Sequence, residues 1–268
     1  MTANPVSSAQ LQQRLATLDS YELPTSLSRP RGSSARLASM GTPIRTPDAA
    51  VVANGVVAFV SGMTEQNKAD VRNTYLYASL VATKAFPRDV DGAQWYERFT
   101  EVLGAVGWIF VGKKYSQHRS HDVGATMDQI GLQMLASAVA SASIPGAAGP
   151  ALLKVANTAM EKLTSGANTK PLSLFNNKAA KSDNGQFTLG SCIESADGEV
   201  IMALGAVHSR SRVNNGNVLL LNWSYGSSQV HTGSAQLVLN ADMYRYVRSA
   251  IQQRLGQHIE AAIELYEI

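Results

Sequence analysis

The chain contains a single cysteine, Cys192. One cysteine excludes an intramolecular disulfide framework and any cysteine-rich metal site, so synthesis inside the cell fits better than secretion through a signal peptide. Residues 1–14 agree with this expectation, because they contain no basic region followed by an apolar run.

Charged side chains are scarce, at 16% of the 268 residues, where soluble proteins average about 25%. The formal net charge of +3 does not by itself indicate nucleic-acid binding, which requires basic side chains concentrated on one face. The longest basic cluster is Lys113, Lys114, His118 and Arg119. We therefore expect no nucleic-acid partner. The 45% of apolar residues excludes a disordered chain and is sufficient for a sizeable core.

Hydrophobic periodicity divides the chain into three parts, which we expect to form one compact α+β domain over residues 1–268, an α/β-type single unit. Residues 1–48 are predicted to be an extended segment with a short helix, 49–165 a helical part, and 185–268 an antiparallel β meander with a C-terminal helix. Strand signals occur at 187–194, 199–207, 217–224 and 229–239, with a hairpin turn at Asp197-Gly198. The final helix is predicted from an apolar stripe: Met243, Val247, Ile251, Leu255, Ile259 and Ile263.

In two apolar segments the spacing of hydrophobic residues does not distinguish a helix from a strand. Residues 49–63 are compatible with a buried helix or a strand pair, and we favour a helix. Residues 108–115 are compatible with a strand or with continuation of the preceding helix.

The most distinctive local feature is an uncharged segment, residues 129–153, with a Pro/Gly break at 144–150. It predicts two helices, about 125–143 and 150–164, joined by a turn. The pair can form a buried hairpin or contact lipid. Each arm of about 15 residues is roughly 22 Å long, shorter than a bilayer core of about 30 Å, so we favour the buried hairpin and expect no pore. Either arrangement creates an apolar environment that can accommodate an acyl chain.

Cys192 lies in a strand-like segment, where a lone thiol can be a buried hydrophobe, a nucleophile or a site of S-acylation. The nearest base along the sequence is His208. A turn centred on Asp197 and Gly198 would place Cys192 opposite residue 203, with His208 some five positions further along the ladder, so we expect no direct contact and no catalytic residues.

No metal or small-molecule cofactor is expected. His118, His121 and Asp122 resemble the start of a metal site, but no further ligand follows at a diagnostic distance. Glycine-rich phosphate-binding motifs are also absent from the sequence.

The organisation of the chain resembles the Erwinia virulence factor (Evf) type of bacterial insect-gut virulence proteins: a helical first part, then a solitary cysteine entering a C-terminal β region. The residues that carry the resemblance are Gly190-Ser191-Cys192. It implies a compact α/β fold and a palmitoyl group in thioester linkage to the cysteine, buried in an apolar pocket. The matching acylation site is Cys192.

We therefore expect a bacterial virulence or toxin-like protein, palmitoylated on Cys192, that acts at a host membrane without conventional enzymatic chemistry. Our hypothesis places the acyl chain among Leu135, Val139, Leu152 and Met160. The expected partner is lipid or a host membrane. The expected location is the cytoplasm of the producing bacterium, with delivery by a route other than a signal peptide, and then the host membrane surface.

Three alternatives stay open at this point. The first is an α-helical pore-forming toxin that uses the 129–164 hairpin. The second is a thiol-dependent acyltransferase or hydrolase, and the third is a structural or assembly protein.

Overall fold

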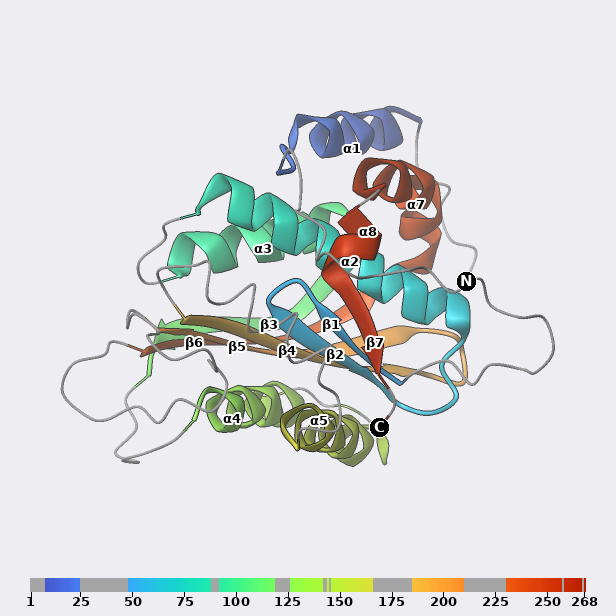
Figure 1. Cartoon of the computed structure of the whole chain (residues 1–268). Coiled ribbons are helices and arrows are strands. Elements are labelled where there is room, and N and C mark those ends of the chain that lie inside the picture. The colour runs from blue at the N-terminus through green and yellow to red at the C-terminus, as the bar shows by residue number, and fades with distance from the viewer. Residues whose placement is uncertain are drawn as a thin grey trace.

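A seven-stranded mixed sheet runs through the centre of the structure (Figure 1). The computed structural model describes residues 8–24, 48–87, 92–118, 126–141, 144, 146–165, 185–209, 230–256, 258–266 and 268. The strand order is β3-β6-β5-β4-β2-β1-β7. The strands are β1 (Ala49–Val52), β2 (Gly55–Phe59), β3 (Trp108–Gln117), β4 (Gly185–Glu194), β5 (Val200–Ser209), β6 (Val230–Leu239) and β7 (Ile263–Tyr266). With helices on both faces of this sheet, the predicted α+β class is confirmed.

The prediction of a helix over 49–63 is wrong, because this segment forms the β1–β2 hairpin. Both strands are buried along their whole length, and a strand buried on both faces has the same continuous apolar sequence as a buried helix. The turn between them contains Ala53, which has a positive φ of 54°, and Asn54. The ambiguous segment 108–115 is also a strand, within β3.

The described helices on one side of the sheet are α1 (Ser8–Ser20), α2 (Glu65–Ala85), α3 (Ala93–Ala105), α7 (Ala241–Leu255) and α8 (His258–Ala262), with α1 outside α3 and α7 (Figure 1). Helix α2 begins after Thr64, whose side chain accepts a hydrogen bond from the backbone N–H of Asn67. Helix α1 is the short helix expected within residues 1–48, and α2 and α3 lie in the part predicted to be helical.

Two helices, α4 (Met127–Ser141) and α5 (Ala148–Thr164), cover the opposite face (Figure 1). Both were predicted, but they form an outer layer and not an interior pair. Each buries only the face that meets the sheet, while residues such as Gln133, Ser137 and Ala140 are exposed. Uncharged polar and small residues can face water, so the lack of charge in this segment does not require full burial.

The meander of β4, β5 and β6 is confirmed, with neighbouring strands antiparallel and Gly198 in the predicted turn at φ 81°. The predicted strand at 217–224 lies outside the described part of the chain, as do residues 25–47 of the segment that was predicted to be extended. The continuous C-terminal helix is wrong in its last part. Helix α7 ends at Leu255 with Gly256 as its cap, and after the short helix α8 residues 263–266 return as β7, which pairs antiparallel with β1.

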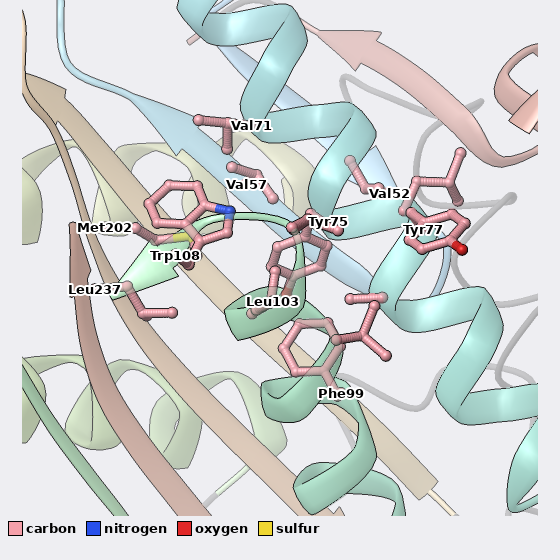
Figure 2. Close-up of a cluster of buried hydrophobic side chains, with 14 of the residues drawn as sticks. Val52, Val57, Val71, Tyr75, Tyr77, Phe99, Leu103, Trp108, Met202 and Leu237 are labelled. Atoms are coloured by element: carbon pink, nitrogen blue, oxygen red, sulfur yellow. The ribbon is translucent and has the colours of Figure 1, made fainter. Parts of the chain in front are cut away.

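The sheet separates two hydrophobic cores. The larger core lies between the sheet and α1, α2, α3 and α7, and Figure 2 shows Tyr75, Phe99, Trp108 and Met202 packed within it. The second core lies between the sheet and the α4–α5 layer, and it contains Leu135 among its fully buried residues. Each core draws on alternate residues of the same strands, as side chains along a strand point to opposite faces.

Candidate functional site

Cys192 lies in β4 on the α2 side of the sheet, with its side chain fully buried in the larger core. Its strand neighbours are Phe59 on β2 and Met202 on β5. Burial raises the pKa of the thiol well above its ordinary value, because a thiolate would lose its hydration there. This environment disfavours a nucleophilic role for Cys192.

The predicted separation of Cys192 and His208 is confirmed. Cys192 pairs with Met202, one position away from the expected residue 203, and His208 pairs with Gln186 at the other end of the ladder. Six residues along a strand correspond to about 20 Å. His208 is instead buried under α3, where it lines a cavity of about 10 Å³ with Tyr96 and Tyr115. That volume corresponds to about one water molecule.

The structure does not bring Cys192 together with the predicted acyl pocket. Leu135, Leu152 and Met160 are buried in the second core, and Val139 packs against that core. Cys192 points into the core on the other side of the sheet. The sequence could not decide between these faces, because a shift of one residue in a strand moves a side chain to the opposite face. Acylation of Cys192 itself stays a prediction.

The proposed beginning of a metal site is not assembled in the described residues. His118 follows the end of β3, while His121 and Asp122 lie outside the described part of the chain. Within that part, no group of three or more His, Cys, Asp or Glu side chains is placed to hold a metal ion.

Helix α4 is seated closely on the sheet through two glycines. A Cβ atom on Gly205 of β5 would lie 2.5 Å from the carbonyl oxygen of Gly131 and 2.9 Å from the backbone nitrogen of Leu135. A Cβ on Gly131 would lie 2.7 Å from the Phe187 ring. Without side chains at these two positions, the helix backbone touches the strand.

The sheet surface beneath α4 becomes polar toward the β6 end. Thr232, Ser234 and Gln236 of β6 are buried on this side, whereas their neighbours Ala235 and Leu237 point into the larger core on the other side. The Gln236 side-chain carbonyl oxygen is buried without a hydrogen-bond partner among the described residues. An unsatisfied buried acceptor costs about 1–3 kcal/mol.

A pocket of about 250 Å³ opens beside this polar surface, between β3, β6 and α4. It is lined by Lys114, Ser116, Gln117, His118, Met134, Ser137, Thr232 and Ser234. In the sequence, Lys114 and His118 stand out only as part of a basic cluster, and this site was not predicted. The available signal was the alternation of polar residues in two segments that pair as strands, but the pairing of β3 with β6 joins residues more than a hundred positions apart.

No protein-family model matches the chain, and no curated protein matches it in sequence. Three solved structures are similar in part. A delta-endotoxin shares 10% identity over 80% of this chain and 96% of its own, with a TM-score of 0.36. The Evf virulence factor shares 11% identity over 95% of this chain and 91% of its own, with a TM-score of 0.29. Activated Cyt2Ba from Bacillus thuringiensis subsp. israelensis shares 9% identity over 68% of this chain and 96% of its own, with a TM-score of 0.29.

At TM-scores this low, the similarity does not establish a shared fold or activity with any of the three proteins. Among the described helices, none is both long and apolar enough to cross a bilayer.

Proposed function

We propose that the protein is a toxin-like virulence protein that acts at the surface of a host membrane, and that the α4–α5 layer makes the contact. The observation that carries this proposal is the separate core beneath the layer. Apolar side chains of α4 and α5 pack only on one face of the sheet, so the layer can move away while the core beneath α2, α3 and α7 stays intact.

Release of the layer would present an amphipathic pair of helices. Their inner faces carry Ile130, Leu135, Leu152 and Leu163, and no charged residue lies between Asp128 and Lys154. Such helices bind in the plane of the membrane interface with the apolar face toward the acyl chains. At 15 and 17 residues, they are about 22 and 26 Å long, short of the roughly 30 Å of a bilayer core. We therefore infer interfacial binding without a pore.

The polar part of the interface lowers the cost of opening. When α4 leaves, we expect the Gln236 carbonyl oxygen to become hydrated. The buried acceptor that is unsatisfied in the closed state then gains a partner in water. The apolar residues that lose contact with the sheet regain an apolar environment at the lipid.

A palmitoyl group on Cys192 belongs to the same proposal as an additional anchor. A single acyl chain gives only marginal membrane binding, so the helical layer would supply the second contact. The chain would start on the α2 side of the sheet, and Phe59 and Met202 would have to move to admit it. Intact mass of protein from its native producer tests this part. A thioester-linked palmitoyl adds about 240 Da and is removed by neutral hydroxylamine, and an unmodified mass rejects acylation without affecting the helical layer.

A site-specific fluorescent label tests the contact. An environment-sensitive dye on Leu132→Cys would report on the apolar face of α4, and a dye on Ala250→Cys would report on α7 as the matched control, both in a Cys192→Ser background. Both native side chains are half-buried, and Leu132 packs against the second core. With vesicles of phosphatidylcholine and phosphatidylglycerol, we expect a blue shift from position 132 and none from position 250. Equal shifts, or none, would reject the layer as the contact, and rapid release of trapped dye would favour the pore-forming alternative.

A further inference from the structure

We propose that the pocket between β3, β6 and α4 binds the phosphate group of an anionic phospholipid. This inference rests on the proposed function, because it identifies the lipid chemistry that the α4–α5 side of the molecule recognises. The pocket encloses about 250 Å³, below the roughly 300–1,000 Å³ of a site for a drug-sized ligand. Its size suits one headgroup and not a whole lipid.

The strand register brings the polar groups together. Lys114 pairs with Ser234 and Ser116 pairs with Thr232, so these four residues form two adjacent cross-strand pairs on the face toward α4. Directly opposite residues in an antiparallel pair have Cβ atoms about 4.5–5.5 Å apart. Ser137 of α4 adds a hydroxyl from above the sheet. The hydroxyl donors therefore come from three separate elements around one space.

The donors of the pocket match a phosphate. Lys114 supplies a cationic donor, the hydroxyls supply further hydrogen bonds, and none of the described residues that line the pocket is acidic. Lys114 and Ser116 are exposed on the edge strand β3. Thr232 and Ser234 are buried, at 5% and 7% exposure, and still line the open pocket. The two strands therefore hold one charged group and three hydroxyls where a ligand in the pocket can reach them.

Apolar side chains further along β3 favour a lipid over a free anion. Ile109 and Val111 are 54% and 61% exposed, and exposed apolar residues beside a cationic site suit a membrane interface. Ile109 pairs with Val238, whose neighbours Leu237 and Leu239 point into the larger core, so Ile109 lies on the same face as the pocket. Five residues of strand, about 16 Å, separate it from Lys114. A bilayer surface along β3 can contact both.

The pocket also orders the steps of membrane contact. Met134 and Ser137 of α4 form one wall, so the site is complete only while α4 is closed on the sheet, whereas its residues on β3 and β6 stay in place when α4 leaves. The phosphate would bind first and hold this face on the membrane, and the layer would open afterwards. A soluble phosphate ligand should then stabilise the closed layer, whereas a vesicle should open it.

The test compares two neighbouring lysines. Lys114→Gln removes a charge from the pocket, and Lys113→Gln removes the same charge from the other face of β3, where Lys113 donates to the Thr100 hydroxyl. Ser234→Ala removes a pocket hydroxyl without changing charge. Binding to phosphatidylcholine vesicles with and without phosphatidylglycerol is measured by sedimentation. Binding of sn-glycerol 3-phosphate and inorganic phosphate to the free protein is measured by NMR titration.

We expect Lys114→Gln to weaken binding to the anionic vesicles about fivefold, Ser234→Ala to weaken it measurably, and Lys113→Gln to change it less than about twofold. If the two lysine variants weaken vesicle binding equally and Ser234→Ala does not, the binding reflects electrostatic attraction of the whole surface to the anionic lipid. That result would overturn the pocket as a binding site without contradicting membrane contact. If the wild-type protein binds no vesicles, the proposed function fails. The NMR titrations test the pocket independently of the vesicles. Chemical-shift changes at Lys114 and Ser234 with inorganic phosphate but not with sn-glycerol 3-phosphate would indicate a free anion site and overturn the lipid assignment. No chemical-shift change with either compound would overturn the site itself.

Discussion

Replacement of Gly205 by alanine should push α4 away from the sheet. The added Cβ would lie 2.5 Å from the Gly131 carbonyl oxygen and 2.9 Å from the Leu135 backbone nitrogen, closer than non-bonded carbon atoms approach. Both neighbours are backbone atoms, so the helix itself must move. Overpacking of this kind typically costs about 1–3 kcal/mol. Since the cost applies only while α4 is closed, it should favour opening of the layer by roughly 5- to 150-fold.

Gly190→Ala is the matched control. Gly190 lies on the neighbouring strand β4 but faces the larger core, and its added Cβ would meet Met202, Tyr75 and Val57 at 3.4–3.7 Å, which is ordinary contact. Alanine also loses less backbone entropy on folding than glycine, an advantage of about 0.5–1 kcal/mol. Urea unfolding and hydrogen exchange of the α4 amides would measure both effects. We expect Gly205→Ala to exchange faster in α4 and to bind anionic vesicles at lower lipid concentration. Equal exchange in α4 of the two variants would refute the reasoning.

Three further predictions follow from the larger core and its surface. The buried Cys192 thiol should react with thiol reagents at pH 8 only as fast as the protein unfolds, because burial raises its pKa; rapid reaction in native buffer would show that the thiol is accessible. Arg248→Ala should lower the free energy of unfolding by about 3–5 kcal/mol, as it leaves the buried Asp70 carboxylate without its bidentate partner, whereas the exposed Arg245→Ala should change it little. Burial raises the pKa of Tyr77 to about 12 from 10, so the unfolded chain loses this proton first and stability should fall between pH 10 and 12; a Tyr77→Phe variant should show a shallower fall.

The amphipathic and capped elements were predictable from the sequence. Helix α2 has a polar cap at Thr64 and a stop before Pro87, and the β4–β5 hairpin has Asp197-Gly198 at its turn. Such signals act over a few residues, so the sequence alone reveals them. The β1–β2 hairpin was not predicted correctly, since strands buried on both faces carry no alternation. The return of the chain as β7 depends on pairing with β1, more than two hundred residues earlier.

The candidate site was less predictable than the fold. The sequence contained Cys192 and the uncharged helices, but only the strand register places them on opposite sides of the sheet. The phosphate pocket depends on the pairing of Lys114 with Ser234 and of Ser116 with Thr232. No local pattern encodes a pairing over that separation. The serine and threonine residues look like ordinary strand residues in the sequence, and they acquire their proposed role only in the folded chain.

Hydrogen exchange of the wild-type protein with and without anionic vesicles tests membrane contact by the α4–α5 layer most directly. The amides of α2 serve as an internal control, because α2 packs on the other face of the sheet. We predict that vesicles change the exchange of α4 and α5 and expose the adjoining amides of β6, while α2 stays protected. Vesicle-bound protein with unchanged exchange in α4 and α5, or with equal changes in α2, would contradict release of the layer.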